Sequence, residues 1–346
     1  MSDKETRHRI IPIFMPEMAC PFKCIYCNQN IITGQEKTAV ENTVEEIIET
    51  YLATIPEGCR VEVAFFGGTF TGMPLNVQES YLKKVQKFID NGSIKSIRLS
   101  TRPDYIDKEN VTLLKHYRVG TVELGVQSMN DTVLEMVKRG YNSDTVMHAV
   151  DLIRRDGIEV GMQMMIGLPG DDEKKAESTA QKIIDAGATN TRIYPTLVVK
   201  NTMLEKMYKD GLYTPLSIEK AVEISKRVLL MFEKAGVMVL RVGLHPTQSF
   251  IEGTGYVAGP FHVSFRELVE TSIWNDILND KLSCKVKQKS YKDSILTVYT
   301  SPKAVNGAVG YNSINKSNLM KMFKEAKFLP DCSLAGREVR MEIKQV

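Results

Sequence analysis

The sequence contains no apolar run of the roughly 20 residues that a helix needs to cross a bilayer. Its first ten residues, MSDKETRHRI, also lack the apolar core of a secretory signal peptide. Both absences favour a cytoplasmic protein with no membrane partner. Because thiols are kept reduced in that compartment, we expect no disulfides to support the fold.

The sequence also lacks a strong overall charge, since the net value is only +3 over 346 residues. The charge is unevenly distributed, however: from Lys281 to Val346 there are 13 Lys and Arg against 5 Asp and Glu, a net +8. The 280 residues before this segment therefore carry −5. A basic segment fits contact with a nucleic acid, but it also fits a solvated lysine-rich surface, and charge alone does not separate these interpretations.

Internal repeats are absent apart from a regular alternation of strand-like and helix-like stretches. Six apolar runs are typical of buried parallel strands, at 10–16, 61–68, 96–103, 121–128, 159–170 and 191–199. Amphipathic helical patterns lie between them, at 40–55, 76–90, 107–117, 131–138, 143–156 and 173–186. Six βα repeats without a hairpin signal predict a parallel α/β sheet, either open or curled into a barrel.

The sequence texture changes after residue 245 and predicts two domains, a core at 1–245 and a small α+β region at 246–346. In the second region we expect a helix at 264–279, a strand at 294–301, a helix at 316–326 and a strand at 339–346. This basic region is the expected cap over the substrate. The candidate substrate contacts are His245, Tyr256, His262, Arg266 and the loop 301–312. Isolated histidines such as His245 and His262 also serve structural roles.

Three of the six cysteines, Cys20, Cys24 and Cys27, fall within eight residues, in the stretch ACPFKCIYC. Thiols this dense in a reducing compartment usually ligate metal. Zinc sites ordinarily have four protein ligands, and so do most iron–sulfur cubes. The other cysteines are isolated: Cys59, Cys284 and Cys332. Three thiolates on a cube would leave one iron open to a small molecule.

The segment CPFKCIYC resembles the CxxxCxxC signature of radical S-adenosylmethionine (radical SAM) enzymes. The resemblance implies a partial (βα)6, TIM-barrel-like barrel in which Cys20, Cys24 and Cys27 hold a 4Fe–4S cluster and SAM chelates the fourth iron. In that family an electron, delivered by a donor such as flavodoxin or ferredoxin, cleaves SAM to a 5′-deoxyadenosyl radical that abstracts hydrogen from the substrate.

Further motifs follow in the order seen in two radical SAM relatives, oxygen-independent coproporphyrinogen oxidase and the catalytic subunit of Elongator. They are FFGGTFTG, IRLSTRPDYID, VELGVQSMND, VKRGY and MIGLPGD. The stretch TRIYPTLVVKNTMLEKMYKDGLY resembles the Elongator subunit specifically, and the resemblance as a whole covers about residues 8–245.

The resemblance implies that eight residues contact SAM. Gly67, Gly68 and Thr69 would present backbone to the methionine amino group, which glycine permits because it has no Cβ. Tyr26 would lie along the adenine. Ser100 stands where the coproporphyrinogen enzyme has a cofactor-contacting glutamate.

The other three residues come from later strands and loops. Gln127 would contact the nucleoside, and Arg139 would pair with the methionine carboxylate through its fork of donors. Gln163 replaces a ribose-binding aspartate and can still hydrogen-bond hydroxyls. No residue is assigned to catalysis on the substrate.

The sequence therefore predicts a radical SAM enzyme, with RNA, in particular tRNA, as the leading substrate class. We expect no acetyltransferase domain, because the chain ends too soon after the barrel region to hold one. The stretch CNQNIITGQ departs from the coproporphyrinogen enzyme and speaks against porphyrinogen decarboxylation. Two alternatives stay open: a radical SAM enzyme acting on a small molecule or peptide, and a non-enzymatic metal-binding protein.

Overall fold

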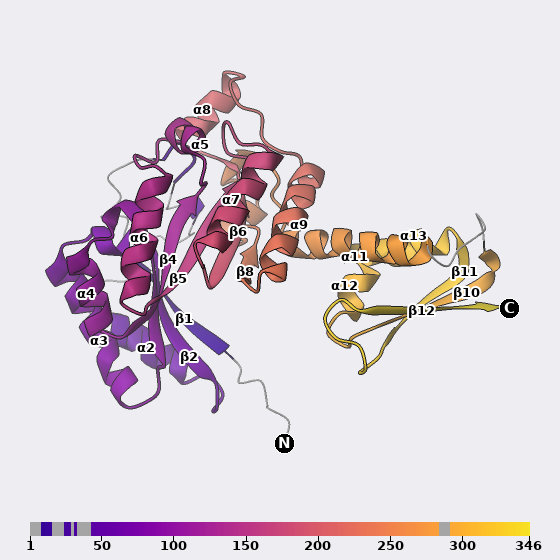
Figure 1. Ribbon diagram of the computed structural model, residues 1–346, viewed down its shortest axis with the longest axis horizontal. Helices are drawn as coiled ribbons and strands as arrows, with labels where there is room; N and C mark the ends of the chain where they lie inside the picture. The colour runs from indigo at the N-terminus through magenta and orange to yellow at the C-terminus, as the bar shows by residue number, and fades with distance from the viewer. Residues whose placement is uncertain (1–7, 16–23, 29–30, 33–42, 284–290) are drawn as a thin grey trace. The chain divides into compact units, whose positions relative to one another are not determined.

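The computed structural model describes residues 8–15, 24–28, 31–32, 43–283 and 291–346 (Figure 1). It divides into two compact units. Unit 1 comprises the described residues up to Ser217 together with Val228–Phe261, and unit 2 comprises Ile218–Arg227 and His262–Val346. None of the described helices is long and apolar enough to cross a bilayer.

Unit 1 is built on a seven-stranded sheet of order β1-β2-β3-β4-β5-β6-β8, in which every neighbouring pair is parallel. The strands are β1 (His8–Met15), β2 (Arg60–Gly67), β3 (Ser96–Thr101), β4 (Val119–Gln127), β5 (Glu159–Ile166), β6 (Asn190–Pro195) and β8 (Met238–Val242). The predicted parallel α/β sheet is thus confirmed. Its seventh strand, β8, lies C-terminal to the six βα repeats.

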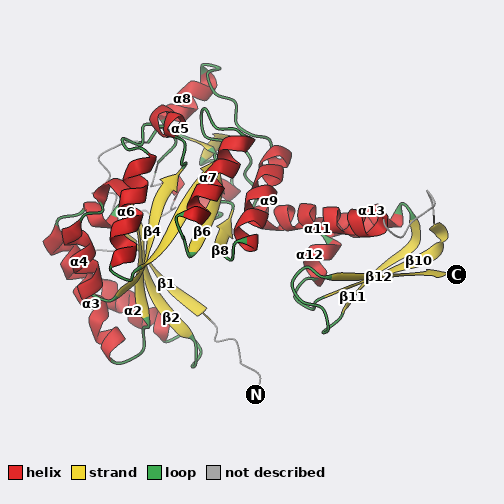
Figure 2. Ribbon diagram, viewed as in Figure 1, coloured by secondary structure: helices red, strands yellow, loops and turns green. Residues whose placement is uncertain are grey.

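Helices follow most strands and pack along the sheet (Figure 2). They are α2 (Val44–Leu52), α3 (Leu75–Asp90), α4 (Lys108–His116), α5 (Asp131–Met136), α6 (Ser143–Arg155), α7 (Glu173–Asp185), α8 (Met203–Lys209) and α10 (Gln248–Ile251). The helix α9 (Ile218–Lys234) is divided between the units, with Ile218–Arg227 in unit 2 and the rest in unit 1. Several begin with an N-cap whose side chain accepts a backbone N–H, as Asp107, Asn130 and Asp172 do. These caps fix where each helix starts after the carboxyl end of its strand.

Short elements complete unit 1. They are the 3₁₀ turns η3 (Phe70–Gly72) and η4 (Pro103–Tyr105) and the antiparallel pair β7 (Val198–Val199) and β9 (Tyr256–Ala258). The pair β7 and β9 ties the chain after β8 back to the segment after β6.

Unit 2 contains a three-stranded sheet of order β11-β10-β12, with β10 parallel to β11 and antiparallel to β12. Its elements are α11 (Phe265–Ser283), β10 (Tyr291–Thr300), α12 (Val305–Val309), η5 (Tyr311–Ser313), α13 (Ile314–Met320), β11 (Phe323–Pro330) and β12 (Val339–Gln345). The predicted helix at 316–326 is wrong in its second half, because α13 ends at Met320 and pairing with β10 makes 323–330 a strand.

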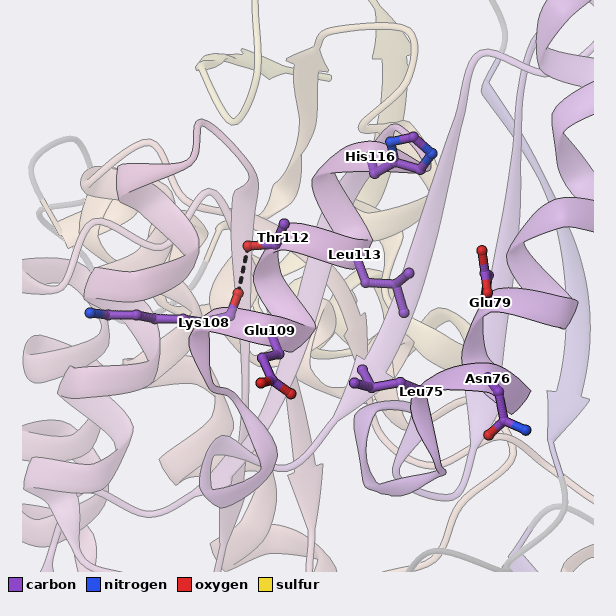
Figure 3. Close-up of a pocket in the computed structure, with 8 residues that line it drawn as sticks. All are labelled: Leu75, Asn76, Glu79, Lys108, Glu109, Thr112, Leu113 and His116. Carbon is purple, nitrogen blue, oxygen red and sulfur yellow. Dashed lines mark hydrogen bonds between the residues drawn. The ribbon is translucent and has the colours of Figure 1, made fainter.

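The helical side of unit 1 has a shallow groove of about 590 Å³ between α3 and α4 (Figure 3). It is lined by Leu75, Asn76, Glu79, Lys108, Glu109, Thr112, Leu113 and His116. None of the residues predicted to bind SAM lines this groove, so it does not mark the candidate site.

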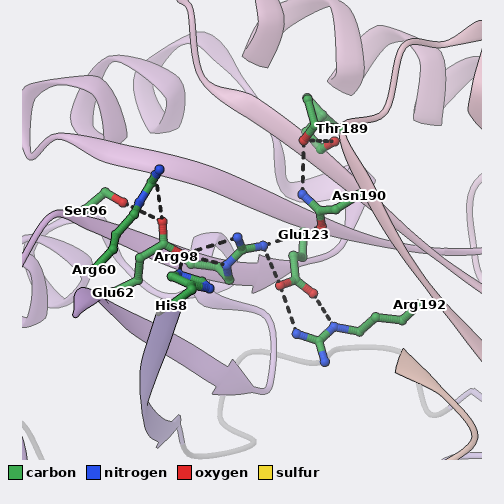
Figure 4. Close-up of polar contacts among 10 residues, drawn as sticks. His8, Arg60, Glu62, Ser96, Arg98, Glu123, Thr189, Asn190 and Arg192 are labelled. Carbon is green, nitrogen blue, oxygen red and sulfur yellow. Dashed lines mark hydrogen bonds and ion pairs between the residues drawn. The ribbon is translucent and has the colours of Figure 1, made fainter. Parts of the chain in front are cut away.

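The opposite face of the sheet holds a buried chain of alternating charges (Figure 4). Arg98 on β3 lies 3.3 Å from Glu62 on β2 and 3.0 Å from Glu123 on β4. Glu123 also binds Arg192 on β6, at 2.6 Å. These four side chains are at most 14% exposed. Burial opposes ionisation of Glu62, but the hydrogen bond from Ser96 and the charge of Arg98 outweigh it and lower the pKa of Glu62.

A further contact of Arg192 shows that the sheet is curled. The Arg192 guanidinium on β6 lies 5.2 Å from the ring centroid of Phe66 on β2. In a flat sheet these strands, four spacings apart, would be separated by about 19 Å. Unit 1 is therefore a partial barrel with this charged layer in its interior.

Arg98→Met leaves the Glu62 and Glu123 carboxylates buried with less compensation, so it should lower the free energy of unfolding by about 3–5 kcal/mol. Lys115→Met is the matched control, because it removes a cation whose partner Asp156 is also exposed, at 2.8 Å, and should cost about 0–1 kcal/mol. Urea unfolding followed by circular dichroism measures both. Equal small losses in the two variants would contradict a structural role for the layer.

Candidate active site

Two of the predicted cluster ligands, Cys24 and Cys27, lie on one backbone turn, where the Cys27 N–H donates to the Cys24 carbonyl at 3.0 Å. The intervening Ile25 fixes this turn to two other elements. Its N–H donates to the carbonyl of Val137 after α5, at 3.4 Å, and its carbonyl accepts from Leu204 of α8, at 2.7 Å. Cys20 lies outside the described residues, so the three-cysteine ligand set stays a prediction.

The turn is also packed into an apolar cluster. The buried members are Cys24, Ile25, Tyr26, Val133, Val137, Leu168, Val198, Leu204 and Tyr213. Cys24 is only 6% exposed, whereas Cys27 is half-buried. The cluster therefore shields the turn from water on one side, as an air-sensitive metal centre needs.

Arg139 brings several predicted residues together. Its Nη1 donates to the Cys24 Sγ at 3.1 Å and to the Tyr26 hydroxyl at 3.2 Å. Its Nε donates to the Tyr141 hydroxyl at 2.8 Å, and Nη2 donates to the carbonyl of Gly125. Burial raises the pKa of Tyr26 well above its ordinary value, although the charge of Arg139 acts in the other direction. Tyr26 is thus a neutral phenol.

Arg102 is a second guanidinium at the same sulfur, and the sequence reasoning assigned it no role. Its Nη1 donates to the Cys24 Sγ at 3.7 Å. Asp104 holds the other edge of the guanidinium by two hydrogen bonds, at 2.9 and 2.8 Å. The Tyr141 ring lies 5.2 Å from Arg102 Cζ and 4.9 Å from Arg139 Cζ, so it contacts both cations. The motifs STRPDY and VKRGY contained the signal for Arg102 and Tyr141.

This donor set fits an iron–sulfur ligand. Cationic N–H groups aimed at a sulfur stabilise it in its anionic, metal-bound form and fix its orientation. No three metal-ligating side chains form a group among the described residues, which do not include Cys20. When bound, such a cluster would be held by Cys24 and Cys27, with Arg102 and Arg139 beside one of its ligands.

The residues predicted on the later strands lie on the inner face of the sheet. Gln127 ends β4 with a positive φ of 68° and is 6% exposed. The side-chain amide of Gln163 on β5 donates to the side-chain carbonyl of Gln127 at 3.5 Å. A Cβ at Gly125 would come within 3.0 Å of the Gln127 amide and 3.6 Å of Arg139 Nη2. The missing side chain therefore leaves room for these polar groups, as a SAM-binding surface would require.

The remaining predicted SAM contacts lie on β2 and β3. Gly67 ends β2 with a φ of 112°, and a Cβ there would lie 2.8 Å from the Met15 carbonyl oxygen. Gly68 follows it, and Thr69, which is 3% exposed, precedes η3. Ser100 is half-buried on β3, beside Glu123 in the register. The predicted residues thus come from neighbouring strand ends, but their contacts with SAM stay predictions.

The loop after β5 is held by two polar side chains. Asp171 accepts from the Gly167 N–H at 2.9 Å, and the Tyr213 hydroxyl donates to the Gly167 carbonyl at 2.7 Å. Burial raises the pKa of Asp171 to about 6, against the effect of the hydrogen bond from Gly167. Burial, with the charge of Asp171, also raises the pKa of Tyr213.

The candidate substrate contacts after β8 have mostly structural partners. Tyr256 packs beside Phe250 and Phe261, and the His262 Nδ1 accepts from the Ser264 N–H at 3.1 Å. Arg266 lies 3.9 Å from Glu270.

In the predicted loop 301–312, α12 is packed so closely that a Cβ at Gly307 would lie 3.0 Å from the Trp274 indole nitrogen. His245 is exposed after β8, and burial followed by the charge of Arg241 lowers its pKa. Of the candidates after β8, His245 is therefore the one that faces solvent beside a cation.

Comparison with known proteins gives two family matches. The model described as the Radical SAM superfamily matches residues 18–183, and the model described as the Radical_SAM C-terminal domain matches residues 189–275. The chain is similar to an uncharacterised protein of Methanocaldococcus jannaschii, with 30% identity over 59% of this chain and 61% of that one. It is also similar to a tRNA uridine(34) acetyltransferase of the same organism, with 29% identity over 62% of this chain and 47% of that one.

Among solved structures, the chain is similar to the archaeal Methanocaldococcus infernus Elp3, with a TM-score of 0.62 and 22% identity. That match covers 79% of this chain and 64% of Elp3. At this identity the likeness shows the fold. The chain spans about half to three fifths of the two curated relatives, so their complete activities do not transfer to it directly.

Arg102→Gln tests the second guanidinium at Cys24. The variant removes the cationic donor while keeping a polar side chain, and it should weaken cluster retention by about 10- to 100-fold. Iron content and visible absorbance after anaerobic reconstitution and desalting measure this loss. Arg118→Gln is the control, because Arg118 is exposed and pairs with Asp90 on the surface. Unchanged iron retention in Arg102→Gln would show that the contact with sulfur is incidental.

Asp171→Asn tests the loop after β5. The folded pKa of about 6 lies above the ordinary 3.8, so the folded chain binds the proton more tightly, and stability falls as pH rises from about 4 to 6. In the wild type this decrease in the free energy of unfolding amounts to roughly 3 kcal/mol at most. Asp171→Asn should not show it.

Urea unfolding of the apoprotein at several pH values measures the effect. Asp172 contributes the opposite pH dependence, because the N–H of Lys175 lowers the pKa of its carboxyl. The Asp172 carboxylate stabilises the fold near neutral pH and this effect is lost as pH falls, so Asp172→Asn should remove it. A parallel pH dependence for wild type and Asp171→Asn would refute the role of Asp171.

Proposed function

The chain belongs to the radical SAM superfamily and is a radical SAM enzyme, and from this premise we propose that its substrate is RNA, in the first instance tRNA. Membership brings two cofactors, a 4Fe–4S cluster and SAM. When bound by Cys20, Cys24 and Cys27, the cluster would supply one-electron chemistry for the cleavage of SAM and so for hydrogen abstraction from the substrate.

In this proposal, different residues of the chain bind the cluster, bind SAM and exclude water. Cys24 and Cys27, with Cys20, hold the cluster, and Arg102 and Arg139 orient the Cys24 sulfur. Gly67–Thr69, Tyr26, Ser100, Gln127 and Gln163 bind and orient SAM along the strand ends. The apolar packing around the cysteine turn excludes water. Arg139 already has four hydrogen-bonding partners, so its predicted pairing with the SAM carboxylate would require it to exchange one of them.

The observation that carries the RNA assignment is a surplus of exposed cations in unit 2. Lys292, Lys321, Lys324 and Lys344 are exposed, and none forms an ion pair within the described part of the chain. Lysines of this kind suit phosphate contacts, which supply most of the affinity in sequence-independent nucleic-acid binding. The similarity to tRNA uridine(34) acetyltransferases supports tRNA as the form of RNA. The predicted substrate-binding role of 246–346 is part of this proposal.

Two further parts of the proposal concern the cell. The enzyme would work in the cytoplasm, where tRNA is modified and thiols stay reduced. A small one-electron donor such as flavodoxin or ferredoxin would reduce the cluster. Neither the donor nor the compartment is needed for the RNA-binding test.

Filter binding of bulk tRNA tests the substrate class. Wild-type protein should retain tRNA at low salt and release it as salt rises, because phosphate contacts displace counterions. The triple variant Lys321→Glu, Lys324→Glu, Lys344→Glu should bind more weakly, and the slope of log affinity against log salt should fall by about 2 to 3.

The matched control reverses three exposed lysines of unit 1, Lys95, Lys108 and Lys174, and so changes the net charge equally. It should affect tRNA retention less than the unit 2 variant. Absence of tRNA retention by the wild type at low salt would remove RNA as the substrate class. Equal losses of tRNA retention in the two triple variants would show that binding depends on net charge and not on the lysines of unit 2.

A further inference from the structure

The inner face of the sheet carries one arginine that the charged layer does not use. The strand register aligns Gly125, Gln163, Arg192 and Arg241 in one row across β4, β5, β6 and β8. Residues aligned in a parallel sheet lie on the same face. Because Arg192 meets Glu123 and Phe66 on the inner face, Arg241 also belongs to that face.

The two arginines of this row differ in their partners. Arg192 holds Glu123 with two hydrogen bonds, at 2.6 and 3.1 Å. Arg241 is half-buried, and no hydrogen bond or ion pair reaches its guanidinium from the part of the chain that the structure describes. Glu62 and Glu123 already form ion pairs with Arg98 and Arg192, so neither carboxylate of the charged layer is available to Arg241.

A guanidinium that has no partner among the described residues is costly at this position. Adjacent strands lie about 4.8 Å apart, and like charges directly opposite each other repel. Partial burial removes water from the cation without supplying an anion in exchange. A ligand anion would remove both penalties.

The position suits a ligand that enters from the side. β8 is the edge strand of the sheet, and Arg241 lies one residue before its end. On the neighbouring strand β6, Tyr194 is the next inner-face residue after Arg192, and it is half-buried. A guanidinium near an aromatic ring is a combination that recognises a nucleotide, through its phosphate and its base.

We infer that Arg241 binds a phosphate group of the substrate at the edge of the partial barrel, next to the predicted SAM site. This inference rests on the proposal that the substrate is RNA. It assigns the exposed lysines of unit 2 to general affinity for the polyanion and Arg241 to the placement of one nucleotide. Arg241 is a binding residue and takes no part in bond breaking.

Equilibrium dialysis of the reconstituted holoenzyme with UMP and with uridine tests the inference, because UMP is a small RNA unit that carries the phosphate. Wild-type protein should bind UMP more tightly than uridine. Arg241→Gln should weaken UMP binding by about 10- to 100-fold, to the level of uridine. Arg241→Lys should give an intermediate loss, since an ammonium lacks the planar fork.

Arg155→Gln is the matched control, because Arg155 is exposed on α6 and the change of residue is the same. It should bind UMP like the wild type. SAM binding, measured in parallel, should be unchanged in Arg241→Gln, which shows that the variant is folded and that Arg241 does not serve the cofactor. Equal UMP affinity in wild type and Arg241→Gln would overturn the inference, and so would loss of SAM binding in the variant.

Equilibrium dialysis with citrate tests whether Arg241 prefers a phosphate or a carboxylate. Binding of citrate but not UMP through Arg241 would overturn the phosphate assignment. The tRNA filter assay separates the inference from the proposed function. UMP binding through Arg241 without tRNA retention sustains the inference for a free nucleotide and refutes RNA. The opposite result sustains RNA and refutes the role of Arg241.

Discussion

The buried ion pairs between Arg98 and its two glutamates are the constraint on which unit 1 depends. They join β2, β3 and β4, and Glu123 extends the chain of charges to Arg192 on β6. Charges of this kind are stable away from water only when each has its partner at short range. Arg192 also lies 5.2 Å from the Phe66 ring on β2, which shows that these strands curl, and the curl brings the strand ends around a common space.

The candidate site has two parts, the cysteine turn and the inner face of the sheet. On one side, the cysteine turn is held by backbone bonds to Val137 and Leu204, with two guanidiniums at the Cys24 sulfur. On the inner face, Gly125 leaves room for the side chains of Gln127 and Arg139. The site is thus assembled from segments that are far apart in sequence, and each is fixed by contacts outside the site.

The strands of unit 1 were predictable because their outer faces are apolar, and the helices because their N-caps and periodicity are regular. The inner face was not predictable in the same way. Strands such as β2 and β4 are buried on both faces, as predicted, but their inner faces hold Glu62 and Glu123, and each is paired with Arg98 on the neighbouring strand β3. Residues 323–326 were predicted as helix because Phe323 and Ala326 have helical spacing, but they pair with β10 as a strand.

The amino-acid sequence by itself determined the parallel α/β class, the cysteine motif and the family, because these depend on local periodicity and on spacing within short segments. Only the tertiary structure decided that Arg102 and Tyr141 join Arg139 near Cys24, and that Arg241 stands without a partner among the described residues. The physical reason is that a charge is paired or unpaired according to what lies within a few ångströms of it. Strand order and register set those distances, and neither is written in any one segment of the chain.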